Sequence, residues 1–260
     1  MLRAYAAFLA VCFLCVRANS AVIVPTISGF TSGEQRVLNS AIDYWEQLIA
    51  DPLPLQIVFS KTSLPDDQSA VSSELVESPG GLPLKAQVQI DDRKGSVIGW
   101  FVDPTPDSNE EFLPGFTPYH MRGRLGTPAG ENYDLLTVLN HELAHVFGFT
   151  TMYSRFKSHV TDADFGLREY HGNGVFAALT SASDGTHVND GVHPNDLMTT
   201  FRSRGERVFP SHLDLAILSD AFGYNVGSPG GTPVPEPNTL LSFTTGLLVL
   251  LIATRNRRAH

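Results

Sequence analysis

The stretch that decides the fold is DLLTVLNHELAHVFG, residues 134–148. Its apolar residues Leu135 and Val138-Leu139 follow the spacing of the buried face of a helix. Asp134 is a suitable N-cap, and Gly148 is suited to end the helix. We therefore expect one capped and largely buried helix over this stretch.

Two histidines of this helix, His141 and His145, are four residues apart. Side chains at this spacing project from one face, so both imidazoles can bind a single zinc ion, with Glu142 beside them as the general base. Zinc lies about 2.0–2.1 Å from a ligating imidazole nitrogen, and a catalytic site needs a third protein ligand and an open fourth position. The pattern His-Glu-x-x-His also arises by chance, so a third ligand elsewhere in the sequence is what would distinguish a zinc site from a chance match.

The first 20 residues predict a secretory signal peptide. An early arginine precedes an almost wholly apolar run from Ala4 to Val16, and Ala18-Asn19-Ser20 resembles a small-residue cleavage site. A membrane anchor is the alternative, although the run is short for a bilayer span. Both cysteines of the chain lie in this segment. The exported part therefore has no cysteine, and any zinc must be held by His, Asp or Glu.

The other end of the chain has three consecutive parts. Residues 227–238 are rich in Gly and Pro and predict an irregular linker that contains the element Val234-Pro-Glu-Pro237. Residues 239–254 are mostly apolar and, as a helix of about 24 Å, fall slightly short of a ~30 Å hydrocarbon core. Residues 255–260 form a basic tip that is expected on the cytoplasmic side. A short helix of the protein core is the alternative for the apolar part.

This order of Pro-Glu-Pro element, hydrophobic helix and basic end resembles the PEP-CTERM sorting signal of Gram-negative bacteria. The resemblance implies recognition by an exosortase, cleavage near the Pro-Glu-Pro element, and release to the cell surface or extracellular matrix. Before processing, the helix at 239–254 would contact the inner membrane.

Residues 21–226 are long enough for one domain with a hydrophobic core. Between the signal peptide and the Pro-Glu-Pro element the chain has 13 basic and 26 acidic side chains, a net charge of −13 at pH 7. So acidic a segment is a poor candidate for binding nucleic acid or an anionic membrane.

Periodicity within this segment predicts an α+β domain. An apolar stripe at helical spacing predicts a helix over Ser32–Ala50, and the polar stretch 60–83, rich in Pro, Gly and Ser, is expected to be a loop. We also expect three strands and a closing helix. The strands are at 55–59, 86–90 and 97–102, and the helix is capped by Ser211.

The prediction of the third zinc ligand depends on a family resemblance. In the metzincin pattern His-Glu-x-x-His-x-x-Gly-x-x-His the last histidine would stand at position 151, which is Thr151 here. The leishmanolysin-like branch instead has a long insertion, and its third histidine comes shortly before a methionine turn. Residues 184–198 resemble that layout, with His187 standing 11 residues before Met198 and Asp-Leu-Met resembling the Met-turn. The resemblance implies His187 as third ligand, and His193 remains the alternative.

Other polar residues are not expected to bind metal. Four histidines are expected at the surface or in loops: His120, His159, His171 and His212. Five aspartates lack the dense spacing of a calcium loop and are expected in solvated loops: Asp103, Asp107, Asp162, Asp164 and Asp190.

The metzincin resemblance implies a zincin-like catalytic domain with a twisted mixed sheet, an active-site helix and a C-terminal helix. It also implies an exported zinc endopeptidase acting on protein or peptide substrates, in which Glu142 deprotonates the water on zinc and Met198 lies below the metal as a hydrophobic floor. Two alternatives stay open. One is a non-proteolytic surface or biofilm-matrix protein that retains a zincin fold and zinc, and the other is a secreted binding domain in which the motif is accidental.

Overall fold

The computed structural model describes residues 20–65, 68–92, 99–115, 117–181, 185–200 and 203–228. The predicted signal peptide up to residue 19, the linker beyond residue 228, the hydrophobic helix at 239–254 and the basic tip at 255–260 lie outside the described residues. In the ranges given, no helix combines the length and the apolar character needed to cross a bilayer.

The described chain is a mixed α+β structure with several sheets, which confirms the predicted class. Its largest sheet has four strands in the order β1-β2-β4-β3. The first three run parallel, with helix α2 connecting β1 to β2, and β3 pairs antiparallel with β4 at one edge. The bounds are β1 Val22–Ser28, α2 Ser32–Leu48, β2 Pro54–Thr62, β3 Ala70–Glu77 and β4 Pro83–Asp91.

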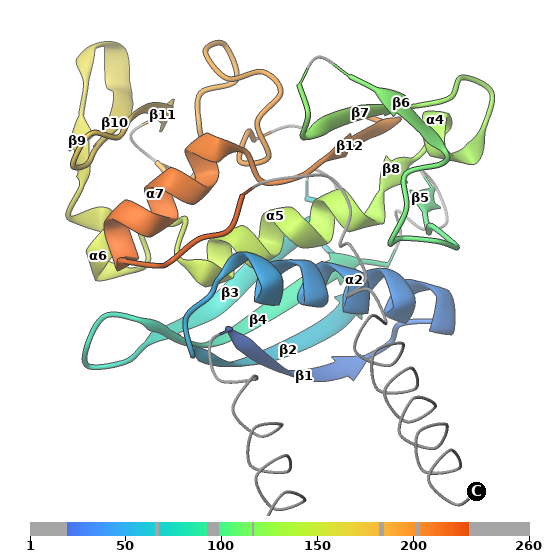
Figure 1. Cartoon of the computed structure of the whole chain (residues 1–260), viewed down its shortest axis with the longest axis horizontal. Coiled ribbons are helices and arrows are strands. Elements are labelled where there is room, and N and C mark those ends of the chain that lie inside the picture. The colour runs from blue at the N-terminus through green and yellow to red at the C-terminus, as the bar shows by residue number, and fades with distance from the viewer. Residues whose placement is uncertain are drawn as a thin grey trace, which may run out of the picture.

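Alternating side chains explain why one face of this sheet carries the helices. On β2, Leu55, Ile57 and Phe59 are buried, while the residues between them face outward. Such alternation is expected of a strand with one covered face. Figure 1 shows α2 and α5 together on that face of the sheet. The sheet and these two helices share one hydrophobic core.

Helix α5 (Leu135–Phe147) lies in the middle of the molecule, between the four-stranded sheet and the part that holds α7 (His212–Phe222) (Figure 1). Its predicted ends are confirmed: the side chain of Asp134 accepts a hydrogen bond from the N–H of Thr137, and Gly148 ends the helix with φ 131°. Nearly all of its side chains are buried. This burial makes α5 a rigid support for the histidines that it carries.

The rest of the described chain forms smaller sheets and short helices above α5 (Figure 1). Two of these sheets have three antiparallel strands, in the orders β11-β10-β9 and β12-β7-β6, and β5 pairs with β8. The strand bounds are β5 Trp100–Phe101, β6 Phe112–Pro114, β7 His120–Gly123, β8 Tyr133–Asp134, β9 Val160–Asp162, β10 Leu167–His171, β11 Phe176–Ser181 and β12 Glu206–Val208. The helices are α4 Pro128–Glu131, α6 Ser154–Lys157 and the 3-10 turn η1 Asp164–Gly166.

The predicted loop at 60–83 is wrong, because β2 continues to Thr62 and β3 occupies much of the remainder. As an edge strand, β3 is only partly covered, and many of its side chains are polar. Its register also shifts between Ser73 and Val76, where Glu74 has φ 50°. A bulge of this kind breaks the period-two pattern that identifies a strand in a sequence.

Two further strand predictions differ from the structure. The strand at 97–102 is reduced to β5, and residues 93–98 lie outside the described part. Strand β1, an edge strand that pairs in parallel with β2, was not predicted from the sequence. By contrast, the strands at 55–59 and 86–90 are confirmed, as is the helix that Ser211 caps.

A buried charge cluster holds the start of α5. Arg207 is fully buried, and its Nη2 donates to Asp103 at 2.6 Å and to Asp134 at 2.8 Å. Its guanidinium also lies 4.1 Å from the ring centroid of Phe112. Asp103, expected in a solvated loop, is therefore in the interior, because it neutralises a buried cation. Since Asp134 is the N-cap of α5, this cluster fixes the N-terminal end of the helix that carries His141 and His145.

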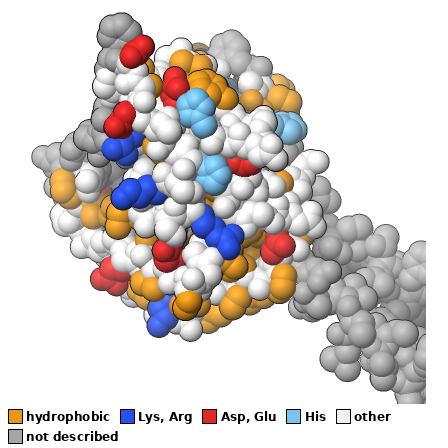
Figure 2. Space-filling view, turned by 90° about the vertical axis from the view of Figure 1, so that its left-hand side faces the viewer, with side chains coloured by type: hydrophobic (Ala, Val, Ile, Leu, Met, Phe, Trp, Pro, Cys, Tyr) orange, Lys and Arg blue, Asp and Glu red, His pale blue; other side chains and the backbone are white. Residues whose placement is uncertain are grey.

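The face shown in Figure 2 has a mixed character. Basic, acidic, hydrophobic and histidine side chains are interspersed on it, without one extended area of a single charge. The acidic excess of the chain is therefore not concentrated on this face.

Candidate metal centre

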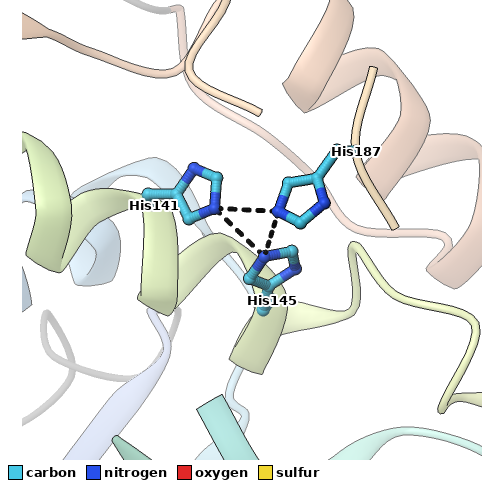
Figure 3. Close-up of side chains that lie close together, drawn as sticks. All are labelled: His141, His145 and His187. Atoms are coloured by element: carbon cyan, nitrogen blue, oxygen red, sulfur yellow. Dashed lines mark hydrogen bonds between the residues drawn. The ribbon is translucent and has the colours of Figure 1, made fainter. Parts of the chain in front are cut away.

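Three histidine side chains from distant parts of the chain converge at one point (Figure 3). The Nε2 atom of His141 lies 3.2 Å from that of His145 and 3.2 Å from that of His187. The Nε2 atoms of His145 and His187 are 3.3 Å apart. Nitrogens that bind one tetrahedral zinc ion at about 2.0–2.1 Å are themselves about 3.3 Å apart. The triangle of nitrogens therefore has the dimensions of a zinc site.

Backbone carbonyls fix the orientation of two of these rings. Nδ1 of His141 donates to the carbonyl oxygen of Leu197 at 2.8 Å, and Nδ1 of His145 donates to that of Phe149 at 2.7 Å. A carbonyl oxygen can only accept, so in the neutral rings Nδ1 bears the proton and Nε2 has a lone pair. Two lone pairs then face each other across 3.2 Å, an arrangement that a cation between them stabilises. Outer contacts of this kind orient histidine ligands in metal sites.

The segment that carries His187 is held by backbone hydrogen bonds on both sides. The N–H of Thr180 on β11 donates to the carbonyl of His187 at 2.9 Å. On the other side, the N–H of Val188 donates to the carbonyl of Met198 at 2.9 Å. Between α5 and this segment, residues 149–186 form α6 and the β9–β11 sheet. The described residues between α5 and His187 thus form one short helix and a small sheet.

The segment that resembles a Met-turn also forms a turn in the structure. Oδ1 of Asp196 accepts from the N–H of Met198 at 3.0 Å, and Oδ2 accepts from the hydroxyl of Ser211, the N-cap of α7, at 2.5 Å. Met198 is fully buried. Because the neighbouring carbonyl of Leu197 accepts from His141, the turn connects α7 to the orientation of a histidine at the centre.

His193, the alternative third ligand, lies outside the cluster. It belongs to the loop between His187 and Met198, where its N–H donates to the carbonyl of Asn189 at 2.9 Å and its carbonyl accepts from the N–H of Asp196 at 3.2 Å. The group of potential metal ligands found in the described part of the chain consists of His141, His145 and His187. The structure therefore brings His187, and not His193, together with His141 and His145.

One of the other histidines departs from its expected position. His120 is buried, with 1% of its surface exposed, because β7 is the central strand of its sheet. Its Nε2 lies 3.7 Å from a carboxylate oxygen of Glu206. The remaining three lie at exposed or partly exposed positions, as predicted: His159, His171 and His212.

The side chain of Glu142 is buried next to this centre, with 5% of its surface exposed. Burial raises the pKa of its carboxyl group to about 7, although the hydrogen bond from Ser72 and the nearby charge of His187 act in the opposite direction. A carboxyl group with a pKa near neutrality can both take up and release a proton, which is what a general acid–base residue must do.

Ser72 on β3 also belongs to the site. Its hydroxyl oxygen lies 2.6 Å from Oε2 of Glu142 and 3.0 Å from the backbone carbonyl oxygen of the same residue. Ser72 is not among the site residues predicted from the sequence, because it lies in the stretch 60–83 that was predicted to be a loop. No local motif marks this serine, and only the pairing of β3 with the sheet brings it to α5.

The comparisons with known proteins bear on the C-terminal end of the chain. The PEP-CTERM protein-sorting motif matches residues 233–258, which confirms the predicted sorting signal. The motif marks a bacterial protein for export, for recognition by sorting machinery of the exosortase type and for the cell surface. No curated protein matches the chain.

Proposed function

We propose that this protein is an exported zinc-dependent endopeptidase with a metzincin-like catalytic domain. The observation that carries the proposal is the convergence of the Nε2 atoms of His141, His145 and His187 within 3.2–3.3 Å of one another. Carbonyl acceptors orient the first two rings so that their lone pairs point to the same place. The long insertion before His187 and the buried Met198 support the likeness to the leishmanolysin-like branch.

The donor set fits zinc and favours a catalytic site over a structural one. Neutral imidazoles are common zinc ligands, and structural zinc sites are usually closed by four protein ligands. The cluster found among the described residues has three ligands, all of them histidines. When bound, zinc would lower the pKa of a coordinated water and polarise the carbonyl of the scissile bond.

Glu142 would handle the protons of the reaction. Its carboxylate would take a proton from the attacking water and deliver it to the amine that leaves. The burial of Glu142 beside the histidines supports this role, since a buried carboxyl group binds a proton more readily than an exposed one.

The free edge of β3 supports a peptide as substrate. Among the described strands, β3 pairs with β4 alone, so its other edge, apart from the Ser72 N–H that bonds Glu142, can offer backbone donors and acceptors to an extended chain. Ser72 of this strand touches Glu142. A peptide added along that edge would therefore pass the groups that hydrolyse it.

Export would place this activity outside the cytoplasm. The sorting motif at 233–258 supports delivery by exosortase-type machinery. Before processing, the apolar residues 239–254 would anchor the chain in the inner membrane, and cleavage near the Pro-Glu-Pro element would release it to the cell surface or matrix.

The test is to measure zinc content and proteolysis on the same purified full chain. Wild type is expected to hold one zinc and to cleave an unstructured protein such as casein. Glu142→Gln, which keeps the size of the side chain but loses the base, should hold zinc and lose about 10²–10⁴-fold in rate. A wild-type protein that holds zinc but cleaves no protein would overturn the proposal and support a non-proteolytic matrix protein.

A further inference from the structure

We infer that Ser72 is a positioning residue for Glu142, holding the carboxylate in the orientation that proton transfer requires. The inference rests on the proposed function and adds to it a residue from outside the His-Glu-x-x-His helix. It follows from one contact between the edge strand β3 and helix α5, two elements that are distant in sequence.

The geometry identifies the direction of the hydrogen bond. The hydroxyl of Ser72 has one proton and two nearby acceptors on Glu142, the carboxylate Oε2 at 2.6 Å and the backbone carbonyl at 3.0 Å. A distance of 2.6 Å lies in the range of about 2.5–2.7 Å for a hydroxyl that donates to a carboxylate. Ser72 therefore donates to Oε2, which leaves Oε1 of Glu142 free to act on the attacking water.

Ser72 is also well placed to restrict how the carboxylate turns. The Glu142 side chain is 5% exposed, so bulk water gives it little alternative hydrogen bonding. Within the described part of the chain, the hydrogen bonds of this carboxylate come from Ser72. The terminal torsion of a glutamate is broad and soft, so in this buried setting the hydrogen bonds from the hydroxyl and the backbone N–H of Ser72 set its orientation.

Packing alone does not account for a serine at this position. Helix α5 packs on β3 and β4 through a hydrophobic core, to which Val88 and Ile90 of β4 contribute. Ser72 pairs with Val88 across the two strands and offers a hydroxyl to the carboxylate. Its side chain thus adds one directed hydrogen bond to the one that the Ser72 backbone N–H makes to Glu142.

The test compares kinetic constants of zinc-loaded full-length variants on a quenched fluorogenic peptide. Ser72→Ala removes the hydrogen bond from the hydroxyl to Oε2 of Glu142. It should lower kcat about 10- to 100-fold, as the loss of a supporting hydrogen bond around a metal site commonly does, and leave KM and zinc content unchanged. Ser72→Thr keeps the hydroxyl and should recover most of kcat. Ser73→Ala is the matched control, because the next side chain on a strand points to the opposite face.

Three outcomes would overturn the inference: a kcat of Ser72→Ala within twofold of wild type, loss of zinc in that variant, or a Ser72→Thr protein no more active than Ser72→Ala. If Ser72→Ala does not fold, Ser72→Cys replaces it, since a thiol of similar shape is a weak donor and should lower kcat while Ser72→Thr does not. Failure of the proposed function is distinguishable, because then the zinc-loaded wild type itself cleaves no peptide.

Discussion

At the scale of single residues, the decisive feature is how the two rings of His141 and His145 are oriented. In each ring Nδ1 donates a hydrogen bond to a backbone carbonyl, and Nε2 points to the centre. The acceptors are the carbonyls of Leu197 and Phe149, so the chain itself selects the tautomer that binds a cation. A site organised in this way binds metal with little rearrangement of its ligands.

A prediction at this scale separates the two candidate third ligands. His187→Ala should lower zinc affinity by more than the roughly 10–100-fold that losing an outer partner costs, because it removes a nitrogen 3.2 Å from that of His141. His193→Ala, in the loop outside the cluster, is the matched control and should leave zinc affinity unchanged. Competition with a chromophoric chelator measures both. Weak zinc binding in His193→Ala with normal binding in His187→Ala would reverse the assignment.

The site residues differ in how far the sequence reveals them. His141, Glu142 and His145 lie within five consecutive positions, so helical spacing alone predicts that the two histidines share a face. His187 stands 42 positions after His145, and only the resemblance to a long-insertion family pointed to it. Ser72 is 70 positions from Glu142 and has no motif, so only strand pairing could reveal it.

At the scale of secondary structure elements, the ends of helices were predictable and the edge strands were not. Thr31 and Ser211 both form capping boxes at the starts of α2 and α7, and such caps are local in sequence. Strands β1 and β3 lie at the two edges of the sheet. An edge strand pairs on one side alone, so its pattern of buried residues is weak, and β3 is further interrupted by a bulge.

A prediction at this scale concerns the C-terminal end of helix α5. Gly148 has φ 131°, and a Cβ placed there would lie 2.3 Å from Cε2 of Phe222. Gly148→Ala should therefore destabilise the fold by several kcal/mol and lower zinc affinity, because the next residue, Phe149, supplies the carbonyl that orients His145. Thermal unfolding and zinc competition measure the two effects.

The matched control for this substitution is Gly166→Ala. Gly166 also has a positive φ, of 74°, but a Cβ there would meet no atom within 4 Å. It should cost only about 1 kcal/mol, from backbone strain alone, and leave zinc affinity unchanged. Equal effects of the two substitutions would show that the contact with Phe222 does not limit this helix end.

At the scale of the whole molecule, buried charged residues connect parts of the chain that lie far apart in the sequence. No local sequence pattern predicts these contacts. Arg207 of β12 reaches Asp103 and the N-cap Asp134, and it also donates to the carbonyl of Ser108 at 3.1 Å. One side chain thus joins the start of α5 to the loop before β6. The α+β class could be predicted from periodicity. This arrangement could not, because nothing in a sequence distinguishes a charged residue that will be buried from one that will be solvated.

A prediction at this scale is that Arg207→Ala destabilises the protein by about 3–5 kcal/mol, since it leaves two buried carboxylates without their cation. Arg122→Ala is the control. The Arg122 side chain is 55% exposed and its nitrogen lies 3.6 Å from Glu206, so its loss should cost about 0–1 kcal/mol. Urea denaturation gives both free energies of unfolding. A cost below 1 kcal/mol for Arg207→Ala would contradict the structural role of the cluster.

The central proposal for this molecule is that three histidines and Glu142 form a hydrolytic zinc centre. The most direct test is to titrate zinc into the metal-free full chain and to follow cleavage of an unstructured protein. We predict no cleavage without metal, a rate that rises in proportion to added zinc, and a plateau at one zinc per chain. Cleavage by the metal-free protein at the same rate, or no cleavage by the zinc-saturated protein, would contradict it.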